Sequence, residues 1–118
     1  MSFGRPVLFA SVTWMLATLP VLAHHSLDVA YDRRQTVTLQ GTVTKMDWSN
    51  PHVHLFVDVA DAGHAVNWQV EMGSPNGQLL RGWKIDTLRP GDHVVVKAYR
   101  ARDGSHLGFA IKITKAGP

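Results

Sequence analysis

The sequence predicts an all-β domain with one short helix, in which five strands close into a small barrel. Two observations lead to this prediction. Five segments have the β-branched composition or the two-residue alternation of strands, and helix signals occupy the stretch between the third and the fourth. The order strand, strand, strand, helix, strand, strand, with a bent first strand, is that of the five-stranded OB barrel. Another five- or six-stranded barrel or a sandwich is the alternative.

The first predicted strand covers residues 35–48 and contains an interior glycine. Its β-branched composition and the spacing of Val37, Leu39 and Val43, two or four residues apart, are typical of a strand. Gly41 interrupts this pattern, and a glycine inside a strand favours a bulge or a sharp bend. Such a bend allows one strand to pair at both ends of a small barrel.

Residues 52–59 and 65–72 are predicted to form a hairpin. Pro51 ends the first strand because proline lacks an N–H group and restricts the residue before it. Residues 60–63 suit a tight turn. The second segment alternates apolar and polar residues, namely Val66, Trp68, Val70 and Met72 against Asn67, Gln69 and Glu71. Matching the apolar faces of the two strands puts Val57 opposite Val66 or Trp68.

The helix and the last two strands follow this hairpin. Ser74 is a suitable N-cap, and Pro75 suits the first helical position. The helix is predicted to be brief, because Gly82 stands where a stop belongs. Residues 94–100 and 107–113 are the fourth and fifth strands, since both alternate and each follows a turn-forming segment.

Residues 1–23 are predicted to be a secretory signal peptide. They combine a positive charge at Arg5, a mostly apolar stretch over residues 7–19, and small residues that end at Ala23. Cleavage there leaves residues 24–118, in which 24–34 form an N-terminal arm and 35–118 form the barrel domain. We expect export to the periplasm, which suits a chain without cysteine. An uncleaved anchor or a buried helix is the alternative.

Composition excludes several functions. Removing 23 of the 118 residues leaves 95, and the loss of Arg5 lowers the formal net charge from +3 to +2. This charge is too small for a nucleic-acid surface, and basic residues are lacking beside Trp48 and Phe56, so no nucleic-acid partner is expected. The absence of Cys excludes disulfides, thiol catalysis and Cys-ligated zinc. We expect no enzyme, because phosphate-loop and nucleophile motifs are lacking and 95 residues barely supply a cleft.

His24 and His25 become the first two residues if the signal peptide is cut after Ala23. The free α-amino group and the imidazole of His24 can then chelate one metal ion, and His25 adds a second imidazole. Reference pKa values of about 7.7 to 8.0 for such an amine and about 6.5 for imidazole leave modest proton competition near neutral pH. With a third nitrogen, this end resembles the histidine brace of copper proteins. The alternative is an end that carries no function.

His52 and His54 are predicted to share one face of a strand, with their backbones about 6.6 Å apart. The hairpin register puts Glu71 opposite one of them and Phe56 on the same outward face. Two imidazoles and a carboxylate are a known ligand set for zinc or iron, and OB barrels bind ligands on this face. Glu71 is predicted either to bind the metal or to orient a ligand. The alternative is a solvated face on which Glu71 only pairs with a histidine.

Trp48 and Asn50 lie beside these histidines in the sequence and, with Phe56, are candidate ligand-binding residues. Trp48 and Trp68 also suit the core, and Asn50 suits an Asx turn. The other histidines and a group of basic residues are assigned to the solvated surface, namely His64, His93, His106, Lys97, Arg100 and Arg102.

Short motifs spread through nearly the whole mature chain resemble those of a known protein family. They are Ala23-His24-His25-Ser26, Tyr31-Asp32, Gly41-Thr42-Val43, Trp48-Ser49-Asn50-Pro51-His52, Trp68-Gln69-Val70-Glu71, Gly82-Trp83 and Pro90-Gly91-Asp92. In these motifs the chain resembles a family of small exported bacterial proteins of unknown function, which implies no activity. In element order alone it is also similar to periplasmic OB-fold proteins, which implies a fold and not a function.

Together these patterns predict an exported, non-enzymatic OB-like barrel that binds a divalent transition metal, copper before zinc. The candidate ligands are His24, His25, His52, His54 and Glu71. The alternative is a periplasmic module that holds a protein or a small non-metal ligand on the outer face of the second and third strands, at Phe56, Asn67 and Gln69.

Overall fold

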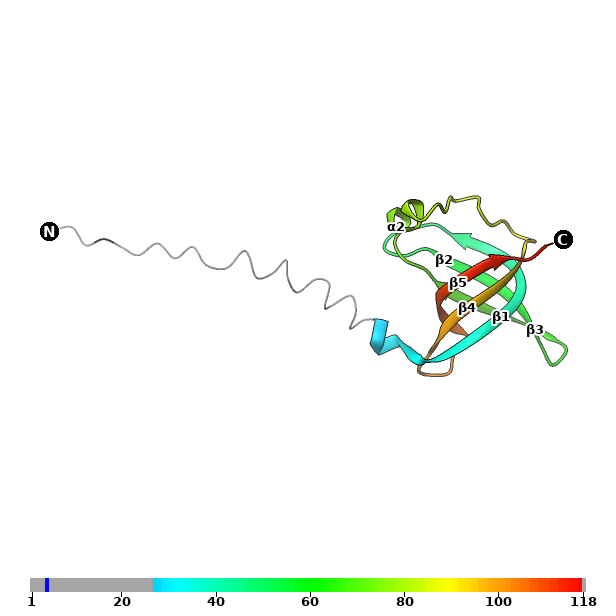
Figure 1. Cartoon of the computed structure of the whole chain (residues 1–118). Coiled ribbons are helices and arrows are strands. Elements are labelled where there is room, and N and C mark those ends of the chain that lie inside the picture. Colours follow the sequence, from blue (N-terminus) through cyan, green and yellow to red (C-terminus); the bar gives the residue numbers. More distant parts are fainter. Residues whose placement is uncertain (1–3, 5–26, 118) are drawn as a thin grey trace.

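The structure is a computed structural model that describes residue 4 and residues 27–117. Five strands form a closed barrel in the order β1-β2-β3-β5-β4, with a short helix between β3 and β4 in the chain (Figure 1). The elements are β1 (Tyr31–Asp47), β2 (His54–Asp61), β3 (His64–Glu71), α2 (Pro75–Leu80), β4 (His93–Ala101) and β5 (Leu107–Lys115). The predicted fold class is thereby confirmed.

The first strand lies between β2 and β4 in the barrel and pairs with both. Gly41 belongs to both pairings. A Cβ atom at Gly41 would clash with the carbonyl oxygen of Asp58 and lie 2.7 Å from Cγ1 of Val57, so only glycine lets β2 approach this closely. The β1–β2 register shifts shortly afterwards, between Val43 and Lys45. One strand therefore serves two neighbours, as its interior glycine predicted.

The hairpin of β2 and β3 has the register that the apolar pattern predicts. Its two-residue turn at residues 62–63 has φ values of 49° and 86°, and positive φ at both positions matches the twist of the flanking strands. Val57 lies opposite Trp68, one of the two registers that the sequence allows, and Glu71 lies opposite His54.

The barrel interior is filled by side chains from β1 to β4 and from the segments that flank them. The buried cluster consists of Leu39, Val43, Val53, Leu55, Val57, Trp68, Val70, Met72, Leu88, Val94, Val96 and Ala98. Trp68 is 7% exposed, as expected of a core residue, and Trp48 is partly buried against the same cluster. Each large side chain in such a core contributes about 1.5 to 3 kcal/mol, which matters in a domain without disulfides.

The short helix α2 has the predicted start and length. The Ser74 hydroxyl accepts a hydrogen bond from the N–H of Gly77 at 3.1 Å, and Pro75 occupies the first turn. The helix ends at Leu80, before Gly82 with its φ of 91°. Ser74 therefore satisfies an N–H group that the first turn would otherwise leave unpaired.

Strand boundaries differ from the prediction by up to four residues, and two of these differences concern Tyr31 and His52. Residues 31–34, assigned from sequence to the N-terminal arm, belong to β1, whose first residue Tyr31 pairs with Ala101 on β4. β2 begins at His54 and not at residue 52. The signal-peptide prediction and arm residues 24–26 lie outside the described residues, apart from residue 4. In the part of the chain that the structure describes, no helix has the length and apolarity to cross a membrane.

Replacing Gly41 with alanine tests the close approach of β1 and β2. We expect Gly41→Ala to lower the free energy of unfolding by about 1 to 3 kcal/mol, because the added methyl group collides with β2. Urea denaturation measures this loss. Gly117→Ala is the control, since a Cβ atom there meets nothing within 4 Å. Equal stability of the two variants would contradict the close approach.

Candidate functional site

A hydrogen-bonded cluster of three side chains lies where β1 begins and β3 ends. Oε1 of Glu71 is 2.6 Å from Nδ1 of His52, and its Oε2 accepts a 2.6 Å hydrogen bond from the Tyr31 hydroxyl. Tyr31 is buried, whereas the His52 side chain is 44% exposed. The cluster thus connects the protein interior to the surface through one carboxylate.

Two strands and the segment before a third strand position this cluster. Tyr31 is the first residue of β1, Glu71 is the last residue of β3, and His52 precedes β2. Backbone hydrogen bonds from Val53 to Gly73 and from Met72 to Val53 hold the His52 segment against the end of β3. Strand pairing, together with these two bonds, therefore brings His52 and Glu71 to the same place.

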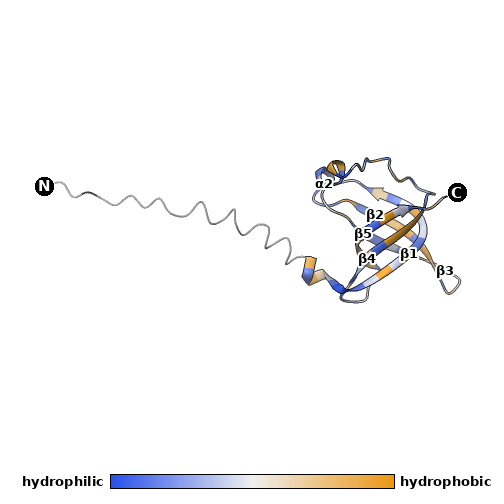
Figure 2. Cartoon of the chain, in the orientation of Figure 1, coloured by the Kyte–Doolittle hydropathy of each residue, from blue (hydrophilic) through white to orange (hydrophobic). Residues whose placement is uncertain are grey.

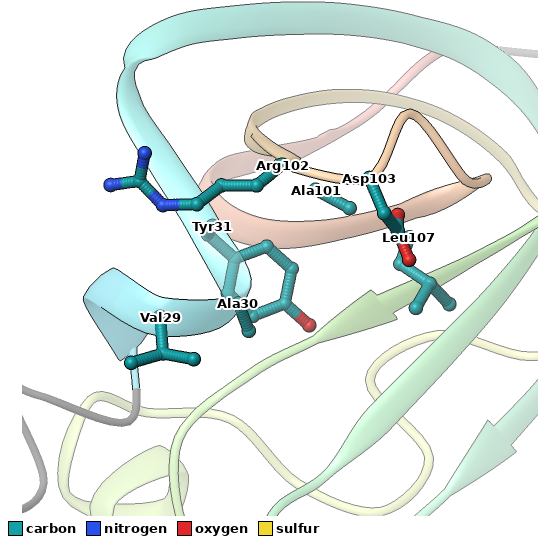
Figure 3. Close-up of a pocket in the computed structure, with 7 residues that line it drawn as sticks. All are labelled: Val29, Ala30, Tyr31, Ala101, Arg102, Asp103 and Leu107. Atoms are coloured by element: carbon teal, nitrogen blue, oxygen red, sulfur yellow. The ribbon is translucent and has the colours of Figure 1, made fainter.

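The ring of Tyr31 lies between the helical turn at residues 27–30 and the turn that joins β4 to β5. Figure 3 shows the ring next to Ala30. Tyr31 lines a cavity of about 180 Å³ together with residues of both turns, including Val29 and Ala101. Nε of Arg102 donates a 2.6 Å hydrogen bond to the carbonyl oxygen of Asp28, and the ring of Phe109 on β5 lies 5.7 Å from that of Tyr31. These contacts fasten the start of the described chain to the barrel next to Glu71.

The surroundings of Tyr31 keep its hydroxyl protonated. Burial raises the pKa of Tyr31 well above its usual range, and the hydrogen bond to Glu71 and the negative charge of Glu71 raise it further. A neutral phenol can donate, and a carboxylate can only accept. Tyr31 is therefore a permanent donor that fixes one oxygen of Glu71 at neutral pH.

The second oxygen of Glu71 fixes the imidazole of His52. Because a carboxylate only accepts, Nδ1 of His52 carries the proton of this contact. In the neutral ring, Nε2 is then the nitrogen with a free lone pair. Metal-binding histidines commonly have this arrangement, in which a carboxylate orients the ring and raises the basicity of the other nitrogen. Both oxygens of Glu71 are engaged, so its position is that of an orienting group.

The structure brings together some of the predicted metal ligands and leaves others untested. His54 lies opposite Glu71 in the hairpin register, and His52 contacts Glu71 directly. Among the described residues, no three His, Asp or Glu side chains converge in a way that could hold a metal ion. His24 and His25 lie outside the described residues.

The predicted ligand-binding residues are largely occupied by neighbours. Nζ of Lys45 lies 5.5 Å from the centre of the Phe56 ring, so the expectation that basic residues are lacking beside Phe56 is wrong. The side-chain amide of Asn67 donates to Asp58 at 2.8 Å and to Thr44 at 3.1 Å. Trp48 packs partly against the core, and Asn50 is exposed in a bend. The remaining histidines are exposed as predicted, namely His64, His93 and His106.

Sequence reasoning missed Tyr31. It lies in the polar stretch Tyr31-Asp32-Arg33-Arg34, where apolar periodicity gives no strand signal. Its burial comes from tertiary contacts with Phe109 and Glu71. The one available signal was that Tyr31-Asp32 belongs to the motifs that carry the family resemblance.

Comparison with known proteins gives a family and a fold. A family model described as "Family of unknown function (DUF6152)" matches residues 13–110. The chain belongs to this family. This membership agrees with the resemblance, noted from the sequence, to a family of unknown function. Export of the protein stays a prediction. A search of curated protein sequences found no match.

Solved structures similar to this DUF6152 protein include mitochondrial single-stranded DNA-binding proteins of S. cerevisiae. Rim1 in one crystal form shares 15% identity, with a TM-score of 0.52 over 71% of this chain and 97% of Rim1. Rim1 in a second form shares 12% identity, with a TM-score of 0.52 over 69% of this chain and 93% of Rim1. At this identity the likeness establishes the OB-like fold alone.

Removing the Tyr31 hydroxyl tests whether its hydrogen bond to Glu71 stabilises the folded protein. We expect Tyr31→Phe to lower the free energy of unfolding by about 1 to 3 kcal/mol at neutral pH, because one oxygen of Glu71 loses its donor. The pKa of Tyr31 is also higher in the folded protein than in the unfolded chain, where it is about 10. The stability that this difference contributes is therefore fully present below about pH 10 and is lost as the pH rises further. Urea denaturation at increasing alkaline pH measures both effects, and the alkaline loss should be smaller in the variant.

Tyr99→Phe is the matched control for the loss of a hydroxyl group at neutral pH, because in the described part of the chain the Tyr99 hydroxyl has no hydrogen-bond partner. The two variants should therefore differ in stability. If Tyr31→Phe is as stable as Tyr99→Phe, then the bond to Glu71 contributes nothing and the cluster does not hold the strand ends together.

Proposed function

We propose that this protein is a small exported barrel that binds a divalent transition metal, copper before zinc, and that it is not an enzyme. The observation that supports the proposal most directly is the half-exposed imidazole of His52, which Glu71 holds through Nδ1. A ring held in this way has its orientation already fixed, its side chain is 44% exposed, and Nε2 is the nitrogen left to bind a metal. Less conformational entropy is then lost when a metal binds.

The proposed metal needs further nitrogen ligands, and the N-terminal segment lies within reach. Export and cleavage after Ala23 would make His24 the first residue, seven residues before Tyr31. Residues 27–30 form a helical turn beside Tyr31, so the extended reach from His24 to this turn is at most about 11 Å. The Tyr31 hydroxyl is joined to His52 through the single carboxylate of Glu71. The amino group and imidazole of His24, with His25, can thus supplement His52.

His54 is the other proposed ligand, since it lies opposite Glu71 on the neighbouring strand. A set of imidazole nitrogens and one amine favours Cu²⁺ over Zn²⁺, because affinities for such ligands peak at copper in the divalent series. Glu71 is assigned the orienting role in this proposal, because Tyr31 and His52 occupy its two oxygens.

Electrostatics favours a metal ion over a nucleic acid as the partner, although the similar solved structures include single-stranded DNA-binding proteins. Binding of single strands relies on a positively charged groove beside aromatic rings. Lys45 does lie over Phe56, but the outer face of β2 and β3 also carries the carboxylates of Asp58 and Glu71, which repel phosphate groups. The face also suits an interaction module less well, because the Asn67 amide is engaged by Asp58 and Thr44.

Copper titration of the correctly processed protein tests the proposal. We expect His52→Ala to weaken Cu²⁺ binding at least tenfold in calorimetry, because the oriented nitrogen is lost. His64→Ala is the control, since His64 is an exposed histidine at the β2–β3 turn. Mass spectrometry of the exported protein must show His24 first. Binding that is unchanged in a double variant, His24→Ala with His52→Ala, would refute the proposed site.

Replacing Glu71 with glutamine separates the orienting role from direct ligation. We expect Glu71→Gln to keep the fold and to weaken copper binding about 10- to 100-fold, because the amide holds the His52 ring less firmly. Electron paramagnetic resonance of the copper complex should report the same nitrogen ligands in both proteins. An oxygen ligand that is present in the wild type and absent from the variant would show instead that Glu71 binds the metal.

A further inference from the structure

A groove beside β5 combines three features that the proposed metal site does not use. The first is an unpaired strand edge. β3 and β5 pair over only three residue pairs, from Gln69 with Leu107 to Glu71 with Phe109, whereas β5 continues to Lys115. From residue 110 onwards, β5 has a described strand neighbour only on its β4 side. Backbone N–H and C=O groups on the other side can therefore accept another strand.

The second feature is a groove along this edge with a mixed apolar and polar lining. A cavity of about 150 Å³ lies between β5 and the segment around α2, and its apolar lining includes Met72, Trp83, Phe109, Ile111 and Ile113. The last two residues of α2, which lie in the chain between the lining residues Gln78 and Arg81, are exposed leucines, with Leu79 53% and Leu80 90% exposed. Figure 2 shows this hydrophobic character on α2. Exposed apolar groups beside a groove favour a binding surface.

The third feature is uncompensated positive charge. The groove is also lined by Arg81 and Lys112 and by no acidic residue. In the part of the chain that the structure describes, neither cation has an acidic partner. Lys112 lies directly opposite Lys97 on β4, and like charges at such positions repel each other. An anionic group placed beside them would relieve this repulsion.

We propose that this groove binds an extended peptide segment of a partner protein, in which apolar residues alternate with acidic ones. The segment would add as a strand to the free edge of β5 around residues 110–114, so that main-chain hydrogen bonds supply affinity. Its apolar side chains would fill the groove beside Trp83 and Ile111. Its acidic side chains would pair with Arg81 and Lys112.

Charge also decides between this partner and a second copy of the chain. The β5 sequence Leu107–Lys115 contains two lysines and no acidic residue. Pairing two β5 edges would bring lysines of like charge together, which destabilises the pairing. The carboxylates of an acidic peptide would instead be attracted to these lysines. The inference is separate from the proposed metal site, because none of its contacts involves His52, and each can fail without the other.

Fluorescence anisotropy with a labelled peptide of about eight residues that alternates valine with glutamate tests the proposal. We expect saturable binding that weakens at least tenfold in Arg81→Glu with Lys112→Glu, because the paired charges become repulsive. Lys45→Glu is the control, since Lys45 lies over Phe56 on the outer face of β1 and β2, outside the groove lining. Far-ultraviolet circular dichroism verifies that the variants fold.

Two further measurements identify the mode of binding. The same peptide with N-methyl groups on alternate residues should lose affinity if main-chain hydrogen bonds form, and amides of residues 110–114 should gain protection from hydrogen exchange with the unmodified peptide. Equal affinity for the methylated peptide would overturn strand addition. Binding to vesicles of anionic phospholipid without binding to the peptide, or dimers that the double variant abolishes, would also overturn the proposal.

Discussion

The close approach of β1 and β2 at Gly41 is the constraint on which the rest of the structure depends. A strand that pairs on one side with β2 and on the other with β4 must curve strongly along its length. The absence of a side chain at Gly41 allows this curvature, because a Cβ atom would collide with β2. The valines around this point, Val43, Val57 and Val94, then point into one core.

The curvature of β1 also creates the side-chain cluster. β1 is long enough to pair with Ala101 at its first residue and with His54 at its last. Its first residue, Tyr31, therefore lies at the end of the barrel where β4 ends. Tyr31 meets Glu71 there, forty positions later in the sequence. Tyr31 and His52 thus share the carboxylate of Glu71, and this geometry is a consequence of barrel closure.

The sequence predicts the parts of this structure that follow from local alternation. Polar and apolar residues alternate in β3, so the sequence predicts the face that carries Glu71 and its position opposite either His52 or His54, and the structure selects His54. Tyr31 could not be placed in this way, because its burial depends on Phe109 and Glu71, which are distant in sequence. His52 was assigned to a strand, whereas it precedes β2 and turns its Nδ1 to Glu71.

The pairing of β3 with β5 differs in kind from every other pairing in the barrel. It is the one parallel pairing among the described strands, and it has three residue pairs against seven for β4 with β5. Without it, the strands would remain as an open antiparallel sheet in the order β3-β2-β1-β4-β5, with a hairpin on each side of β1. Closure therefore requires no threading of the chain, and the barrel can open at this junction while both hairpins stay intact.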